Sequence, residues 1–390
     1  MTKPLDGIKV LDFTTLLPGP MAGLILAEGG AEVIKIERTE GEEMRRYQPP
    51  WGKEAVTFTM LNRGKKSLAL NLKNPVQRAR LLPLVGESDV VLEQFRPGVM
   101  DRLGLGYEVL KAINPGLIYC AITGYGATGP KRSAAGHDLN YVGDAGLLSL
   151  SHGTPEAPVL PPALIADIAG GTYPAVMNIL LALLQRQHTG EGAFLDIAMT
   201  DGLFTFQYWA LGEGLSTGQW PKPGGGLVTG GTPRYQLYPT ADGRLMAAAP
   251  LEEKFWTAFC QAIALPEVWR DDAKDPKGTK RAVAEIVASK SALDWAPILA
   301  EADCCCTIMQ TTEEALADPH FAARGLFANR LVNEAGAEMP ALPVPLAPVF
   351  RGDDEARSAP ALGADNDEIL KGKPSTSWTS PRSKRPASSI

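Results

Sequence analysis

The alternation of apolar segments in the first 120 residues limits the fold more than any other feature of the chain. Apolar, β-branched stretches typical of buried strands alternate with segments that carry helix start and stop signals. The expected strands are "GIKVLDFT", "AEVIKIER", "SLALNLK", "DVVLEQF" and "PGLIYCAITGYG", and the expected helices include "PGPMAGLILAEGG" and "NPVQRARLLPLVGES". This order predicts an α/β fold whose parallel sheet has helices on both faces and binds its ligand at the carboxyl ends of the strands.

Several familiar kinds of site are disfavoured by the motifs. The first strand-to-helix connection, "FTTLLPGPMAG", does not match the G-x-G-x-x-G fingerprint, which argues against a dinucleotide. The chain has no P-loop or H-E-x-x-H motif, and no G-x-S-x-G nucleophile elbow between a strand and a helix is expected. Its four histidines are scattered, so no metal site is expected.

Charge and cysteine content indicate the compartment and the class of partner. The net charge of −6 gives no reason to expect nucleic acid or an anionic membrane as a partner. The apolar segment "AVMNILLALLQRQ" is expected to be a buried helix too short to span a bilayer. The run Cys304–Cys306 suits neither a disulfide framework nor a zinc ribbon, and we expect it in a short buried strand. With no secretory signal at the start, a cytoplasmic protein is expected.

Composition also changes along the chain. Residues 191–224 are expected to form a connection rich in Gly, Pro and Thr, and residues 225–325 a smaller domain that starts with a hairpin turning at Ala241-Asp242-Gly243. Residues 371–390 are polar, basic and rich in Pro and Ser, which predicts a disordered tail.

His137, Asp167 and Glu252 are the candidates for catalysis. His137 and Asp138 stand side by side in "AAGHDLNYVGDAG", where the plain alternative is a packed histidine and an aspartate that caps a turn. Asp167 precedes a long apolar helix, so it is expected at the helix N-cap, where backbone N–H groups also suit an oxyanion. Glu252 alone cannot be told from an acidic residue in a first helical turn.

Basic side chains gather near expected strand ends. They are Arg38, Arg63, Lys65, Lys66 and Arg96. Charge runs are often only solvated surface, but this placement favours a phosphate-bearing ligand. The residues by themselves therefore predict an α/β enzyme, with Asp167 and His137 as its reactive groups.

The opening "GIKVLDFTTLLPGPMAGLILAEGGAEVIKIER" resembles the start of the family III CoA-transferases (CaiB/BaiF type) and their racemase relatives. "NRGKKSLALNLK", "QFRPGVMDRLGLGYEVL", "ITGYGATGP", "TGEGAFLDIAMTDGL" and "PALGADNDEIL" continue the match in order. The resemblance implies a large Rossmann-like domain from both chain ends, here 1–190 and 326–370, a smaller α+β domain from the middle, and an interlocked homodimer. It implies acyl-CoA thioesters as substrates, with coenzyme A as part of the substrate and no permanently bound cofactor.

The same resemblance assigns candidate residues. The basic residues named above become coenzyme A contacts, together with Gly136, Asp138 and Tyr141. In the transferases an aspartate at the position of Asp167 attacks the thioester, whereas the 2-methylacyl-CoA racemases exchange the α-proton between a histidine and that aspartate.

The racemases resemble "GHDxNY" where this chain has Gly136 to Tyr141, and a glutamate that orients their histidine falls at Glu252. The glycine-rich loop of several transferases has no good match in "PKPGGGLVTGG". We therefore expect a racemase, with a CoA-transferase as the alternative. A third interpretation, a non-catalytic protein that binds coenzyme A, leaves Asp167, His137 and Glu252 without a role.

Overall fold

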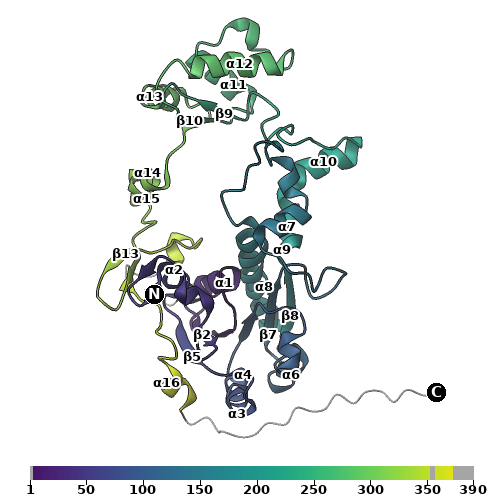
Figure 1. Ribbon diagram of the computed structural model, residues 1–390, viewed down its shortest axis with the longest axis vertical. Helices are drawn as coiled ribbons and strands as arrows, with labels where there is room; N and C mark the ends of the chain where they lie inside the picture. The colour runs from purple at the N-terminus through teal and green to yellow at the C-terminus, as the bar shows by residue number, and fades with distance from the viewer. Residues whose placement is uncertain (1–2, 352–355, 372–390) are drawn as a thin grey trace, which may run out of the picture. The chain divides into compact units, whose positions relative to one another are not determined.

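The computed structural model describes residues 3–351 and 356–371, so the predicted disordered tail lies outside the described residues except for Lys371. The described residues form two compact units (Figure 1). Unit 1 contains the residues up to Val142, Leu164–Leu203 and those from Ala323 on, and unit 2 contains Gly143–Ala163 and Phe204–Ala322. Unit 2 thus includes segments expected in the large domain and in the connection.

Two hydrogen bonds explain why the early segment belongs to unit 2. The Gln207 side chain donates to the Ala145 carbonyl at 2.9 Å, and the Gly224 N–H donates to the Leu150 carbonyl at 2.8 Å. The segment after residue 143 is therefore tied to the middle of the chain. Composition cannot show such long-range pairing.

A six-stranded parallel sheet forms the centre of unit 1. Its parallel arrangement confirms the prediction, and a sixth strand, from Ala193 to Ala198, joins the five that were expected. Its strands, in spatial order, are β5 (Lys66–Ala69), β2 (Glu32–Glu37), β1 (Lys9–Asp12), β6 (Val90–Glu93), β7 (Ile118–Thr123) and β8 (Ala193–Ala198). Numbered along the chain within this sheet, the order is 3-2-1-4-5-6, which is that of the doubly wound Rossmann sheet. The strand order reverses between β1 and β6, and such a point is where open α/β sheets bind ligands.

Helices cover both faces of this sheet. The burial of every residue of β6 and β7, whose side chains point alternately to the two faces, shows this cover. The helices α4 (Leu82–Gly86) and α6 (Tyr107–Ile113) share one core with sheet residues such as Leu11, Val91 and Tyr119. The helix α1 (Pro18–Glu28) packs in a second core with α2 (Val56–Asn62).

The helix expected from "AVMNILLALLQRQ" is longer and less buried than predicted. A π-helical turn, η3 (Ala166–Thr172), continues directly into α8 (Tyr173–Thr189). The joint run of 24 residues is long and apolar enough to cross a membrane by length and composition, a test that core helices also pass, and 44% of its most apolar window is buried. The prediction that it is too short was wrong because it left out the π-helical turn.

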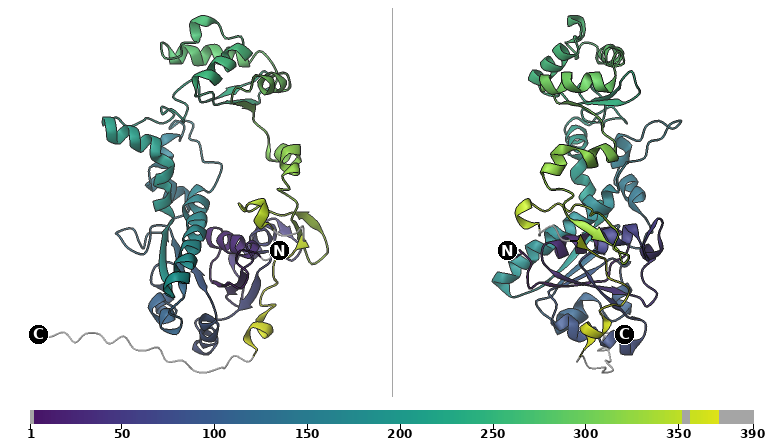
Figure 2. Two further views of the ribbon diagram at one scale, coloured as in Figure 1. Left: turned by 180° about the vertical axis from the view of Figure 1, so that it is seen from behind. Right: turned by 90° about the vertical axis from the view of Figure 1, so that its left-hand side faces the viewer.

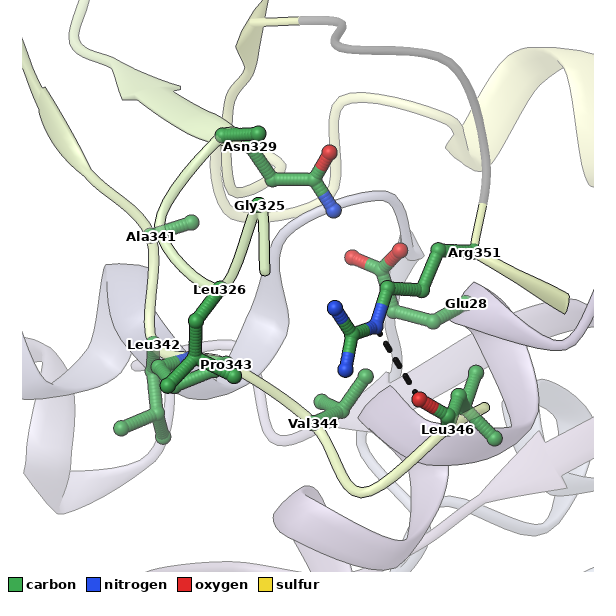
Figure 3. Close-up of a pocket in the computed structure, with 11 residues that line it drawn as sticks. Glu28, Gly325, Leu326, Asn329, Ala341, Leu342, Pro343, Val344, Leu346 and Arg351 are labelled. Atoms are coloured by element: carbon green, nitrogen blue, oxygen red, sulfur yellow. Dashed lines mark hydrogen bonds between the residues drawn. The ribbon is translucent and has the colours of Figure 1, made fainter. Parts of the chain in front are cut away.

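The last part of the chain returns to unit 1. The Asp365 carboxylate accepts the Ser67 N–H at 2.7 Å, and Asn366 accepts the Ala69 N–H at 2.8 Å, so residues near the C-terminus bond to the edge strand β5. Residues 325–351 surround Glu28 at the end of α1 and leave a cavity of about 40 Å³ (Figure 3). There the Arg351 guanidinium donates to the Leu346 carbonyl at 3.0 Å.

Unit 2 is an α+β unit. Its antiparallel sheet has the order β11 (Cys306–Ile308), β10 (Leu245–Ala248), β9 (Gln236–Pro239), and the helices α11 (Glu253–Ala262), α12 (Pro276–Val287) and α13 (Ala292–Ala302) pack on it (Figure 2). The hairpin expected at residues 241–243 joins β9 to β10, with Gly243 at φ +76°. Of the cysteine run only Cys306 lies in the buried strand β11, while Cys304 is buried outside it and Cys305 is exposed. All five cysteines are free thiols.

Candidate active site

A cavity of about 290 Å³ lies in unit 1 at the carboxyl ends of β1, β6 and β7. The ends of these strands and the segments that follow them supply its walls: Thr15, Leu16 and Pro18 after β1, Gln94 to Pro97 after β6, and Ile122 to Tyr125 at the end of β7. This is the edge of the sheet where the strand alternation predicts a ligand, beside the point where the strand order reverses. We call it the active-site cavity.

Leu16 in this wall has a backbone conformation that side chains seldom adopt. Its φ is +62°, and the Glu42 carboxylate accepts its N–H at 3.0 Å. Left-handed backbone at a residue other than glycine costs free energy, and in folded proteins it gathers at functional sites.

The active-site cavity brings together five of the predicted site residues. They are Arg96, Gly136, His137, Tyr141 and Asp167. Two candidate proton-transfer groups, one imidazole and one carboxylate, therefore face the same space, with a guanidinium in its wall.

Asp167 lies inside the π-helical turn η3 rather than at a helix N-cap. The N-cap residue of that turn is Ile165, and α8 begins only at Tyr173. The expected N-cap role was therefore wrong, because the helical run starts before the carboxylate instead of after it. Single π-helical turns are rare and often mark functional sites.

Burial and, after it, the negative charge of Asp138 raise the pKa of the Asp167 carboxyl, and with His137 opposing the shift the result is about 6. Asp138 is buried, and its carboxylate accepts the backbone N–H of Asp167 at 3.0 Å. Asp138 thus holds the backbone of the candidate catalytic aspartate. No hydrogen bond joins Asp138 to the ring of His137 among the described residues.

Because the Asp138 carboxylate raises the pKa of Asp167, replacing Asp138 should change how the activity depends on pH. Any reaction that uses ionised Asp167 must rise with pH through about 6 and level off above it. In Asp138→Asn the charge that raises the Asp167 pKa is gone, while the amide oxygen can still accept the N–H. We expect the acid limb of the kcat/KM profile to move to lower pH. Asp201→Asn, which changes an exposed carboxylate in the same unit, is the control; an acid limb that stays in place in Asp138→Asn contradicts the prediction.

The other residues of "GHDxNY" fix the local backbone. His137 directly precedes α7 (Asp138–Asp144), and the Asn140 side chain accepts its N–H at 3.0 Å. Tyr141 donates its hydroxyl to the Gly136 carbonyl at 2.5 Å. A Cβ on Gly136 would come within 2.6 Å of the Tyr141 ring, so this position has room only for glycine. The motif therefore presents His137 from a rigid turn.

Close packing under Asp167 gives a stability prediction. A Cβ on Gly170 would lie 2.1 Å from the Met199 carbonyl oxygen, which is backbone and cannot move aside cheaply. We expect Gly170→Ala to destabilise the protein by about 1–3 kcal/mol, measured by denaturant unfolding. Gly212→Ala, in the helix α10 (Tyr208–Thr217) with no atom within 4 Å of the added Cβ, is the matched control and should unfold no more easily. If Gly170→Ala and Gly212→Ala lose the same free energy of unfolding, the close packing at Gly170 is not the cause and the prediction is wrong.

A second cavity, of about 820 Å³, shares Thr15, Leu16 and Phe95 with the first. Arg38 lines it, as do Lys73 and Arg102, which the sequence analysis missed. The signal for both was present, because Lys73 is the last residue of the expected strand "SLALNLK" and Arg102 follows "QFRPGVMD".

The other predicted basic residues are engaged by the protein itself. Lys65 is buried and donates to Asp12, to Asn62 and to the Pro20 carbonyl, each at 2.9 Å. Arg63 is also buried, and its guanidinium donates to Glu28 at 2.8 Å and to the carbonyls of Met60 and Leu342.

Because an ammonium group has three donors, Lys65 has none left for a phosphate. Lys66 is partly exposed and pairs with Glu32 at 3.3 Å and with Glu368 at 2.7 Å. These contacts give Arg63, Lys65 and Lys66 structural partners, and neither cavity is lined by them.

Glu252 belongs to unit 2, at the exposed N-cap of α11, where its side chain makes no capping hydrogen bond. Its suggested role in orienting His137 stays a prediction. Within residues 3–351 and 356–371, no group of three or more His, Cys, Asp or Glu side chains is placed to hold a metal ion.

The sequence profile of the family described as CoA-transferase family III matches residues 5–366 of this chain. The chain belongs to this family. The resemblance inferred from the sequence motifs is confirmed.

Curated relatives of this family III chain include both reaction types. It is 34% identical to the alpha-methylacyl-CoA racemase of Homo sapiens over 94% of its own length and 92% of that protein. It is 33% identical to the acetyl-CoA:oxalate CoA-transferase of Acetobacter aceti over 94% of its length and 95% of that protein. Among solved structures, Rv3272 from M. tuberculosis aligns with a TM-score of 0.80 at 30% identity, over 94% of this chain and 99% of that one.

Proposed function

We propose that this family III enzyme interconverts the stereoisomers of 2-methylacyl-CoA thioesters by exchanging their α-proton. The observation that carries the proposal is that His137 and Asp167 line one cavity at the switch point of the sheet. The racemases among the relatives support the same reaction. Acyl-CoA chemistry itself is common to both kinds of relative.

The two neighbouring cavities, which share Thr15, Leu16 and Phe95 in their walls, suit the two ends of a coenzyme A thioester. Arg38, Lys73 and Arg102 in the larger cavity are the cations we propose for the nucleotide phosphates. Carboxylates line the same cavity, namely Glu37, Glu40, Glu42 and Glu43, and Glu43 lies 3.9 Å from the Arg38 guanidinium. Arg96, Gly136 and Tyr141 line the active-site cavity and would face the thioester end. Asp138 does not line that cavity and contributes by accepting the Asp167 N–H.

In the proposed reaction, one of the two groups removes the α-proton and an enolate forms. The other group then donates a proton to the opposite face of the same carbon, so that no atom is gained or lost. Asp167 suits the role of base because its raised pKa, about 6, places the carboxylate close to the proton affinity that catalysis near neutrality needs. His137 supplies the second group, and Glu252 is proposed to orient it.

The alternative is CoA transfer through Asp167 as nucleophile. The carboxylate attacks the thioester carbonyl, the C–S bond breaks and the CoA thiolate leaves. The thiolate then attacks the aspartyl carbonyl of the mixed anhydride, which releases the first acid and leaves an aspartyl-CoA thioester for the second acid to attack. The oxalate and glutarate transferases among the relatives favour this reading.

One incubation separates the two reactions. The enzyme receives a single enantiomer of a 2-methylacyl-CoA in D₂O without free acid, and NMR follows the α-proton while mass spectrometry follows the CoA species. Deuterium entry with loss of optical purity supports the racemase. A new thioester that forms only after a carboxylic acid is added, with the α-proton untouched, supports the transferase. Binding without either reaction supports a non-catalytic protein.

A homodimer, interlocked as the family resemblance implies, is part of the proposal. Met177, Leu181 and Leu184 lie on one face of α8 and are each more than half exposed. Contiguous apolar exposure of this kind marks an interaction surface. We expect a solution mass of twice 41.6 kDa by light scattering, and a shift to single chains in Leu181→Glu but not in Gln187→Glu. A wild-type monomer contradicts the dimer.

The five free thiols also support a reducing, cytoplasmic location for the enzyme.

A further inference from the structure

Glu93 is a buried carboxylate that the proposed reaction does not use. It is the last residue of β6 and is 7% exposed. Its Oε2 accepts the backbone N–H of Phe95 at 2.6 Å, a short distance typical of a bond to a charged acceptor. Tyr119 on β7 donates its hydroxyl to the same carboxylate.

The residues held by Glu93 form the wall of both cavities. Gln94, Phe95, Arg96 and Pro97 line the active-site cavity, and Phe95 lines the larger cavity as well. The loop is anchored a second time by Gln94, whose side-chain oxygen accepts the N–H of Gly19 in α1 at 3.0 Å. Glu93 thus fixes, from behind, the segment that carries Arg96.

The groups around Glu93 make its charge sensitive to pH. The titratable groups that act on it are Tyr119 on β7 and Asp101 on α5 (Val99–Arg102), and its charge in turn acts on the Cys120 thiol; none of these groups is a cation. Burial therefore raises the pKa of the Glu93 carboxyl to about 7, against the lowering effect of the Phe95 N–H and the Tyr119 hydroxyl.

We propose that Glu93 is a positioning residue that sets the affinity for coenzyme A, by holding the loop of Phe95 and Arg96 firmly when it is ionised and loosely when it is protonated. This inference rests on the proposed function, since it assumes that the two cavities bind the coenzyme. Hydrogen bonds to an ionised acceptor are about twice as strong as neutral ones. Protonation therefore leaves Arg96 less well ordered for an anionic ligand, and the affinity falls as the pH drops through the Glu93 pKa.

The test is the dissociation constant of coenzyme A itself, measured by calorimetry between pH 6 and pH 8.5. Because Asp167 titrates in the same range, the comparison uses Asp167→Asn as background, with and without Glu93→Gln. We expect the Asp167→Asn protein to lose roughly fivefold in affinity from the upper to the lower pH. The double variant should bind coenzyme A, at every pH, with the weaker affinity that Asp167→Asn alone shows at the lower pH. In the wild-type chain, Glu93→Gln should raise KM at pH 8 and leave kcat within about twofold.

Tyr119→Phe gives an independent readout that a merely structural role of Glu93 does not move. Loss of the phenol removes a hydrogen bond that favours the charged carboxylate, so the midpoint of the affinity profile should move to higher pH. If Glu93→Gln leaves the pH profile of the coenzyme A affinity unchanged, the inference is overturned. If Glu93→Gln fails to fold, the inference is overturned when the midpoint of the affinity profile does not move in Tyr119→Phe. Absence of coenzyme A binding by the wild-type protein at every pH overturns the proposed function instead.

Discussion

Asp167→Ala is expected to lower kcat/KM by roughly a thousandfold or more, whichever of the two reactions the enzyme performs. As a racemase it loses one of its two proton-transfer groups, and as a transferase it loses the nucleophile that carries the acyl group and then the coenzyme. The pKa of about 6 means that most of this carboxyl is ionised at neutral pH, the form that both reactions need. Water is a far weaker base and nucleophile than a carboxylate, so water that fills the space left by the side chain does not replace it.

Asp167→Asn is the matched variant, because it keeps the shape and the backbone of the π-helical turn. Both variants should retain cooperative unfolding and bind coenzyme A within a few-fold of wild type. Activity within tenfold of wild type in the asparagine variant removes Asp167 from the chemistry.

His137→Ala is expected to separate racemisation from proton exchange. With two groups on opposite faces of the substrate, each enantiomer presents its α-proton to one of them. Without His137, the enantiomer whose proton faces Asp167 should still take up deuterium, but without inversion. Racemisation in both directions should fall by roughly 10²–10⁴-fold. NMR of each pure enantiomer in D₂O measures both quantities.

An exposed histidine in the last turn of α8 provides the control. His188→Ala should leave racemisation and exchange at wild-type rates. If His137→Ala instead keeps near wild-type CoA transfer while the wild-type enzyme shows no α-proton exchange, the transferase alternative holds and the histidine is a structural part of the "GHDxNY" turn.

Local patterns in the sequence predict the parallel sheet and five of the residues that line the active-site cavity. The strands have near-continuous apolar runs, and the "GHDxNY" residues bond almost wholly to one another, so both are visible within short windows. Asp138 is the exception in that motif, because its partner is the backbone of Asp167, 29 residues away.

Burial is what the sequence does not reveal. Arg63 and Lys65 look like surface cations in "NRGKKSL", yet their partners Glu28 and Asp12 come from the end of α1 and from β1. A buried ion pair needs both residues to be brought together by the sheet, and nothing in a window of ten residues shows that. Glu93 was overlooked for the same reason, since its chemistry depends on Tyr119 in the neighbouring strand.

The bonds between β5 and the end of the chain affect how the protein is made. Ser67 and Asp365 are 298 positions apart, so at roughly 5–20 residues per second the ribosome adds Asp365 about 15–60 s after Ser67. During that interval the outer edge of the nascent sheet has unpaired N–H and C=O groups, which are a template for pairing with other chains. Chaperone binding during synthesis should therefore be concentrated on ribosome-bound chains that have β5 but lack residues 365–366.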